Sequence, residues 1–375
     1  MGISRPVNNP YFACSWESGW EIDENMMAIG MDVHKSKITA HAIPIFEDDI
    51  DDNENSNEFN FKFSKLTSSR PGLTQMAAYL SDKEHCILIE NSTITHDIYW
   101  MLIDLGCTVM VAFATELYRI TQSVKKTDEH DCKELAHYMR KKILGEEEFA
   151  VCLIVDQKTM DRRQLCRLYY NESMLLSDIR RQIRSYMLLR GIKIENEARD
   201  IVSERNLRQL ATIESNTLKL LIEKARSTKK RVRECEKTIS KEFSDDEIYQ
   251  RIITIPGFGV ITSAYISSMI IDPKRFETQK KFSAYFGIVP KQRISNETSE
   301  KCGITRRGDC ILRMMLLQAT HVHITNDIDR VSSVSRTYEH LRSRGMPHKK
   351  ALTAAANKMT KIVFALLSKG ESYEL

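Results

Sequence analysis

The chain has 375 residues, 42% of them hydrophobic, which is enough for one to three domains with buried cores. Its net charge of +4 is too small to identify a polyanionic partner by composition alone. Nine dispersed cysteines without a CxxC pair argue against a zinc ribbon or a disulfide framework, and reduced thiols favour a cytoplasmic protein. Residues 1–25 form an N-terminal tail unlike a signal peptide, and no run has the roughly 18 apolar residues of a membrane span, so no membrane association is expected.

The first predicted domain, residues 26–157, combines strands and helices. Three strands come first, and the acidic stretch 46–58 is expected to be a hairpin loop between the second and third. Helices and strands then alternate, so the order predicts an α/β domain with a mixed sheet. The predicted strands are 26–33, 37–44, 59–65, 85–90 and 108–113, and the predicted helices are 71–82, 94–105 and 127–143.

The next segment, residues 158–245, is rich in charge, and apolar residues recur in it at three- and four-residue spacing. This pattern predicts long helices, in part a coiled coil, and self-association through this segment is one possibility. A helical spacer that packs on its own chain is the alternative. The basic stretch 224–241 could hold phosphates even in a chain of near-neutral charge.

The last predicted domain, residues 246–375, is mostly α-helical. Residues 251–273 predict a helix, a tight Pro-Gly-x-Gly turn and a second helix, similar to a helix-turn-helix hairpin. Gly257 and Gly259 would let the backbone approach a phosphate at the start of the second helix, although a plain helix turn explains the same pattern. Further helices are expected at 275–288, 309–325 and 347–368.

Four acidic residues have a placement that suggests metal chemistry. Asp32 lies near the end of the first strand and Glu90 ends the strand 85–90. Asp128 and Asp131 are three residues apart at the start of a helix, so they share one face. Oxygen ligands of this kind select Mg²⁺ or Mn²⁺, and two such ions can clamp a phosphodiester. Each acid alone is also explained as a solvated charge, and Asp128 as a residue that favours the helix dipole.

Six sequence blocks resemble one family as a set. They are GMDVHK (30–35), IE (89–90), KKTDEHDCKELA (125–136), IPGFGVITSAYI (255–266), RFETQKKFSAYFGIVPKQ (275–292) and GITRRGDCILRMML (303–316). The first three resemble the N-terminal domain of IS110-family transposases, which is RuvC-like with an RNase H fold. The last three resemble the C-terminal transposase domain of the same family. The resemblance extends over about residues 27–370.

The resemblance implies roles for particular residues. The acidic tetrad of the family carries over to Asp32, Glu90, Asp128 and Asp131, and its serine nucleophile to Ser295. Around that serine this chain lacks the glycines usual in the family, so Thr298 and Ser299 are rival nucleophiles. Asn91-Ser92 also replaces the usual Thr-Gly after the second acid, which loosens that corner of the site. His34 is expected to be a structural residue more than a helper of the metal site.

The resemblance also implies a mechanism and partners. The serine would attack a phosphodiester and form a covalent link to DNA beside the Mg²⁺ or Mn²⁺ site. Donor and target DNA, a guide RNA from the same element, a homodimer or tetramer, and a nucleoid-associated location are implied. A Holliday-junction resolvase-like endonuclease and a catalytically silent nucleic-acid-binding protein are the alternatives. Phosphate contacts are expected from the basic residues near the serine, although a solvated face explains the same pattern; the residues are Lys291, Arg293, Lys301, Arg306 and Arg307.

Overall fold

The structure is a computed structural model that describes residues 25–46, 61–113, 117, 127–194, 200–295, 298–305 and 308–373. The chain divides into two compact units, Met1–Asp156 and Gln157–Leu375. The N-terminal tail up to residue 24 and the expected hairpin loop from residue 47 lie outside the described residues. Among the helices that are described, none combines the length and the hydropathy needed to cross a bilayer.

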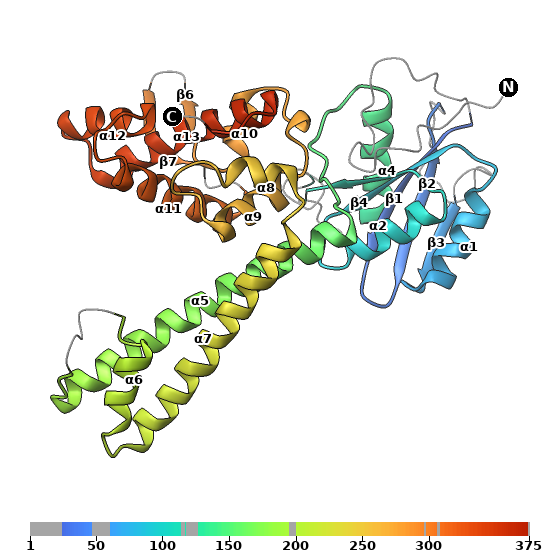
Figure 1. Cartoon of the computed structure of the whole chain (residues 1–375). Coiled ribbons are helices and arrows are strands. Elements are labelled where there is room, and N and C mark those ends of the chain that lie inside the picture. Colours follow the sequence, from blue (N-terminus) through green and yellow to red (C-terminus); the bar gives the residue numbers. More distant parts are fainter. Residues whose placement is uncertain are drawn as a thin grey trace. The chain divides into compact units, whose positions relative to one another are not determined.

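The first unit is built on a five-stranded sheet with the order β3-β2-β1-β4-β5 (Figure 1). The first three strands pair antiparallel, whereas β1 pairs parallel with β4, and β4 parallel with β5. The predicted α/β domain with a mixed sheet is therefore confirmed. The strands are β1 (Met27–Val33), β2 (Ile38–Pro44), β3 (Phe61–Leu66), β4 (His85–Glu90) and β5 (Val109–Ala112).

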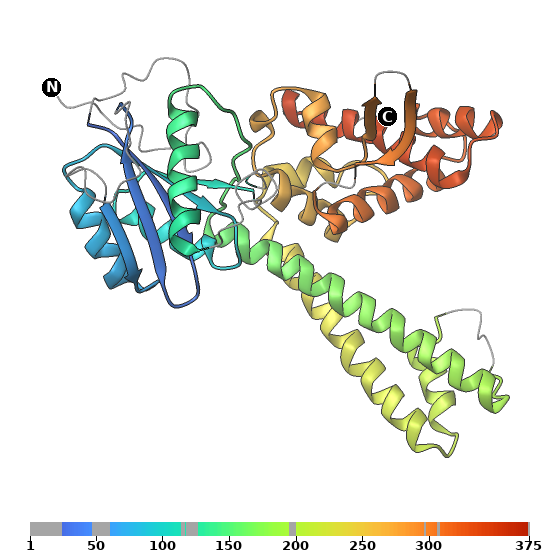
Figure 2. The ribbon, with the colours of Figure 1, turned by 180° about the vertical axis from the view of Figure 1, so that it is seen from behind.

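Helices cover both faces of this sheet, because its central strands are apolar on both sides (Figures 1 and 2). Met31 and Ile89 belong to the core that contains residues of α1 (Arg70–Leu80) and α2 (Thr95–Asp104). Their neighbours on the opposite face, such as Leu88, pack with α4 (Asp128–Ile143). Successive side chains of a strand point to opposite faces of the sheet, so the alternation determines which side chains can contact α4.

The second unit begins with two long antiparallel helices, α5 (Gln157–Arg190) and α7 (Asn216–Glu242), with the short α6 (Glu204–Ala211) between them in the chain (Figure 1). Their shared core contains Ile179, Ile183 and Ile222. The predicted long helices are confirmed, while a supercoiled seam and self-association remain predictions.

The rest of the second unit is mostly helical, as predicted, around a core that contains Tyr265, Phe282 and Phe286. The expected helix 275–288 is shorter, because Thr278 caps a new helix there after a single 3-10 turn. A hairpin of two strands and one further helix were not predicted. The elements are α8 (Glu247–Ile252), α9 (Val260–Ile270), η1 (Pro273–Arg275), α10 (Gln279–Tyr285), β6 (Pro290–Ser295), β7 (Thr298–Ile304), α11 (Cys310–Asn326), α12 (Ser333–Ser343) and α13 (His348–Lys369).

Candidate active site

The sheet register places Asp32 and Glu90 side by side. Met31 of β1 pairs with Ile89 of the parallel strand β4, so Asp32 and Glu90 are the next residues along the two strands. Neighbouring strands are about 4.8 Å apart. Both acids alternate with Met31 and Ile89, which point into the core beneath α1 and α2, so both acids face the side covered by α4.

A glycine lets α4 lie directly on β1. A Cβ atom placed on Gly30 would be 2.6 Å from Cβ of Leu135 and closer still to backbone atoms of Cys132 and Ala136. The thiol of Cys132 also donates a hydrogen bond of 3.0 Å to the carbonyl oxygen of Thr39 in β2. This close packing holds the N-terminal turn of α4, which carries two of the predicted acids, beside the end of β1.

The turn that follows Glu90 is fixed by side-chain hydrogen bonds. The hydroxyl of Thr95 donates to the carbonyl oxygen of Glu90 at 3.0 Å and accepts from the amide of Ser92 at 2.8 Å. The amide of Asn91 donates to the carbonyl oxygen of Ala112 in β5 at 2.9 Å. These bonds fix the backbone at Asn91-Ser92, where this chain differs from the Thr-Gly that usually follows the second acid in the resembling family.

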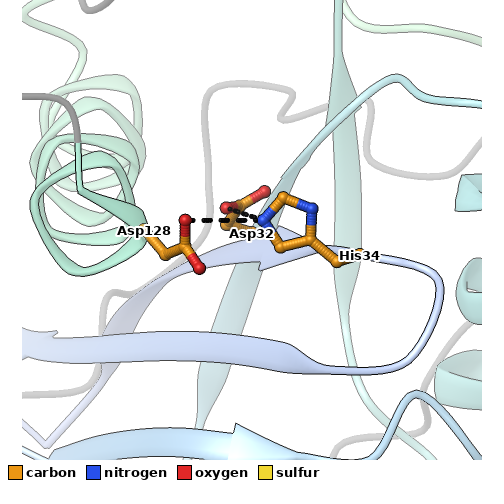
Figure 3. Close-up of side chains that lie close together, drawn as sticks. All are labelled: Asp32, His34 and Asp128. Atoms are coloured by element: carbon orange, nitrogen blue, oxygen red, sulfur yellow. Dashed lines mark ion pairs between the residues drawn. The ribbon is translucent and has the colours of Figure 1, made fainter.

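Three side chains meet at the junction of β1 and α4 (Figure 3). Nε2 of His34 lies 3.1 Å from Oδ2 of Asp32 and 3.5 Å from Oδ1 of Asp128. Each of the three offers one ligand atom within 4.8 Å of the others. Their side chains are 25% (Asp32), 47% (His34) and 37% (Asp128) exposed, so a cation from solvent can reach them.

Asp128 has a cationic partner, Lys37, that the sequence did not suggest. Nζ of Lys37 donates a hydrogen bond of 2.5 Å to Oδ2 of Asp128. This hydrogen bond and the charges of Lys37 and His34 outweigh the desolvation of Asp128 and lower its pKa, and the same hydrogen bond raises the pKa of Lys37. Lys37 therefore neutralises part of the acidic cluster.

The other acids are less well neutralised. Burial raises the pKa of Asp32; the charge of His34 opposes this rise, and the charges of Asp128 and Asp131 add to it. Burial also raises the pKa of Glu90, and the charges of Asp32 and Asp131 add to that shift. Glu90 and Asp131 are outside the three-residue group but close enough to repel Asp32. Such repulsion favours a cation between the carboxylates.

The donor set fits a divalent cation. Asp32 and Asp128 offer carboxylate oxygens. His34, which was not a predicted ligand, offers an imidazole nitrogen. Carboxylates suit Mg²⁺ and Mn²⁺, and an added imidazole favours Mn²⁺ and other transition metals over Mg²⁺. His34, expected to be a structural residue, thus lies in the cluster. Its place two residues after Asp32, just past the strand end, was the available signal.

The predicted nucleophile lies in the second unit. Ser295 is the last residue of β6 and pairs with Thr298, the first residue of β7. The rival Ser299 pairs with Ile294 one step further along the hairpin. The structure describes the backbone of this hairpin, and it places all three hydroxyl residues at one end of it. The choice among them stays open.

The Pro-Gly-x-Gly turn has a packing role. Gly257 has φ +94°, and a Cβ atom there would lie 2.5 Å from the carbonyl oxygen of Ala319 in α11. The buried His323 of α11 also bonds the carbonyl oxygen of Pro256 through Nδ1 at 2.8 Å. Gly259, in contrast, is the exposed N-cap of α9 with open space around it. Only Gly259 therefore has room beside it for a phosphate.

The predicted basic residues divide between described and undescribed parts of the chain. Lys291 and Arg293 lie in β6, and Lys301 lies in β7. Arg306 and Arg307 lie outside the described residues. The hairpin thus carries three of the five, and their contacts with phosphates remain a prediction.

Comparison with known proteins shows a similarity to transposases. Residues 249–335, from α8 to α12, match the model of the transposase IS116/IS110/IS902 family. The chain is 27% identical over 212 residues to the transposase for insertion sequence element IS1111A of Coxiella burnetii, covering 55% of this chain and 57% of that one. It is 31% identical over 142 residues to the transposase for insertion sequence element IS1328 of Yersinia enterocolitica, covering 37% and 41% of the two chains.

A longer match extends over both units. The chain is 24% identical over 361 residues to the putative transposase y4pF/y4sB of Sinorhizobium fredii, covering 93% of this chain and 86% of that one. By contrast, the chain spans only about half the length of the first two relatives. The chain is thus similar to transposases over both units, and its residues 249–335 match the model of the IS116/IS110/IS902 family.

Proposed function

We propose that this protein cuts and rejoins DNA with a divalent cation held by carboxylates of the first unit and a serine hydroxyl of the second. The observation that carries the proposal is the convergence of Asp32, His34 and Asp128 within 4.8 Å. Glu90 and Asp131 add negative charge beside them. A transposase needs such a centre, because breaking a phosphodiester bond concentrates negative charge on phosphate oxygens.

Asp32 and Asp128 would hold the cation, with His34 as a nitrogen ligand and Glu90 and Asp131 as the remaining acids of the tetrad. Mg²⁺ or Mn²⁺ bound there supplies electrostatic stabilisation of the charge that develops on phosphate oxygens. Lys37 donates a short hydrogen bond to Asp128 and would compete with the cation for that carboxylate.

Ser295 is the proposed nucleophile. Its hydroxyl oxygen forms a bond to phosphorus while the bond from phosphorus to one deoxyribose oxygen breaks, and that oxygen departs with a proton. A hydroxyl of a second DNA end then attacks the phosphoserine and releases the serine. Each cycle breaks and forms the same number of phosphodiester bonds, so no ATP is needed. Donor and target DNA are the substrates of this reaction.

A guide RNA and a dimer or tetramer are further parts of the proposal, which rests here on the similarity to this transposase family. Lys291, Arg293, Lys301, Arg306 and Arg307 are proposed to contact phosphates of these nucleic acids. The exposed N-cap Gly259 offers backbone N–H groups of α9 for a further phosphate contact.

A plasmid recombination assay in Mg²⁺ or Mn²⁺, combined with detection of a protein–DNA adduct under denaturing conditions, tests the proposal. Asp32→Asn is expected to abolish strand exchange. Glu129→Gln, an exposed acid one residue from Asp128, is the matched control and is expected to keep full activity. Ser295→Ala is expected to abolish the adduct, whereas Ser299→Ala and Thr298→Val are expected to keep it.

The possible results separate the alternatives. Cleavage of branched DNA without any adduct would favour a resolvase-like endonuclease over the serine mechanism. DNA binding without cleavage by the unaltered chain would favour a silent binding protein. Full strand exchange by Asp32→Asn would overturn the metal site, and an adduct formed by Ser295→Ala would move the nucleophile to a neighbour.

A further inference from the structure

The outer face of α7 carries a continuous row of positive charge. Six exposed basic residues follow one another at intervals of three, four or seven positions. These intervals keep the side chains on one side of an α-helix, within about 40° of a common line. The residues are Lys219, Arg226, Lys230, Arg233, Lys237 and Lys241, called the basic row below.

The basic row lies away from the packed side of α7. Ala225, Thr228, Cys235 and Ile239 are among the residues that the helix buries, and their directions lie roughly 120–180° from that of the row. Because α5 and α6 take up the buried side, the row faces solvent within this unit. The row is therefore accessible to a partner as far as this unit is concerned.

Most of the row has no compensating charge. Arg226 pairs with Glu204 at 2.8 Å, and Lys230 pairs with Glu234 at 3.8 Å. The other four basic residues form no ion pair with any residue that the structure describes. The acidic residues of α7 on this side are Glu223 and Glu234, and they are too few to balance the basic row, so this face is strongly positive. Repulsion along such a row is relieved when a polyanion binds.

The length and composition of the row fit a nucleic-acid duplex. From Lys219 to Lys241 the helix rises about 33 Å, close to the roughly 34 Å repeat of duplex DNA. Residues 216–242 contain no aromatic side chain. Proteins that hold single strands usually stack bases on aromatic rings, so this face suits a duplex backbone better than unstacked bases.

We infer that the basic row of α7 binds the phosphate backbone of duplex DNA without reading its sequence. Lysine and arginine contacts to phosphates position DNA and carry no base preference. The inference rests on the proposed function for its choice of DNA. It adds a contact surface on the α5–α7 helices, outside both the acidic cluster and the β6–β7 hairpin.

The test uses the full-length protein and a 30-base-pair DNA duplex of arbitrary sequence, measured by fluorescence anisotropy in EDTA at several salt concentrations. Arg233→Gln/Lys237→Gln removes two charges from the row while keeping good helix formers. Arg184→Gln/Lys224→Gln removes two exposed charges elsewhere on the same pair of helices and is the control. Circular dichroism and thermal unfolding verify that both variants are folded.

The row variant is expected to bind the duplex roughly ten-fold more weakly. The slope of log K against log salt should become less negative by about two, since each phosphate contact contributes about 0.9 to its magnitude. Arg233→Glu/Lys237→Glu should lose more. The control should stay within about two-fold of the unaltered protein. Equal losses in row and control variants would overturn the inference, as would an unchanged affinity in the row variant.

Two other outcomes assign the row to a different partner and also overturn the inference. One is preferential loss of binding to duplex RNA or to single strands of the same length. The other is a changed sedimentation coefficient with unchanged DNA affinity, which would indicate that a second copy of the chain covers the row. Because binding is measured without a divalent cation, failure of the proposed catalysis would leave this test intact.

Discussion

Gly30 offers a sharp test of how the acidic cluster is assembled. In Gly30→Ala the new methyl group would be 2.6 Å from Cβ of Leu135 and nearer to backbone atoms of α4. Ordinary contacts begin near 3.4 Å, so α4 must move away from β1 by about 1 Å or more. Overpacking of this kind costs about 1–3 kcal/mol. For a unit of this size, that cost lowers the unfolding temperature by roughly 3–10 °C.

The same displacement should weaken cation binding, because Asp128 moves with α4 while Asp32 stays on β1. Loss of one good ligand corresponds to about 1.4 kcal/mol or more, which is a ten-fold weaker affinity. Isothermal titration with Mn²⁺ and thermal unfolding in EDTA measure the two effects separately. Gly303→Ala is the control, since a methyl group there meets no atom within 4 Å. Unchanged Mn²⁺ affinity and unfolding temperature in Gly30→Ala would refute this reasoning.

Three further predictions concern other contacts. Lys37→Gln should bind Mn²⁺ about three- to ten-fold more tightly in titration calorimetry, because Lys37 competes with the cation for Asp128; weaker binding would contradict this. Gly257→Ala should unfold several degrees lower, because its methyl group meets α11 and its φ is +94°, at a cost of about 1–3 kcal/mol; Gly259→Ala should change little. Burial opposes ionisation of Asp327, but hydrogen bonds from Ser335, Ser332 and Val331 outweigh it and hold its pKa below the usual range. The stability from that ionised carboxylate is complete above the unfolded pKa of about 4 and is lost as pH falls towards the lower folded pKa. Asp327→Asn should therefore remove part of the acid sensitivity in unfolding curves recorded from pH 6 to pH 3, and identical curves would contradict the assignment.

The first unit was predictable because its strands are apolar, short and separated by turn-forming residues. The stretch 85–90 was predicted as a strand, and β4 has the same bounds. The order of elements then required a mixed sheet. What the sequence could not provide was register: one step of slip would turn Asp32 away from α4. In the observed register, Gly30 packs closely against α4. A single glycine in a strand sequence does not indicate which helix will pack on it.

The hairpin of β6 and β7 was not predicted, although its sequence contains the proposed nucleophile. Residues 290–304 alternate weakly, with Lys, Gln, Arg, Ser and Glu at most positions and no Asn-Gly or Asp-Gly turn. Strand formation there depends on pairing between the two segments, which local composition does not report. The helix expected over 275–288 was too long for a similar reason, because the Thr278 cap was not recognised inside an apparently helical run.

His34 and Lys37, which were not predicted as residues of the acidic cluster, reach it because of a short turn. The amide of His34 donates to the carbonyl oxygen of Lys37 at 2.9 Å, which closes the connection between β1 and β2. This turn brings the His34 and Lys37 side chains back over Asp32 and Asp128. Residue spacing alone could not distinguish such a turn from an open loop, so His34 was expected to be structural.

In the proposed mechanism, cation binding and nucleophilic attack depend on different parts of the chain, so the two steps can be tested separately. Asp32 and Glu90 are aligned by strand pairing, and Asp128 and Asp131 are placed by α4, all within the first unit. Ser295 belongs to a hairpin of the second unit. Loss of the serine should therefore leave Mn²⁺ affinity unchanged while it abolishes the covalent link to DNA. Loss of Asp32 should reduce Mn²⁺ affinity and strand exchange together, because the cation and the reaction share that carboxylate.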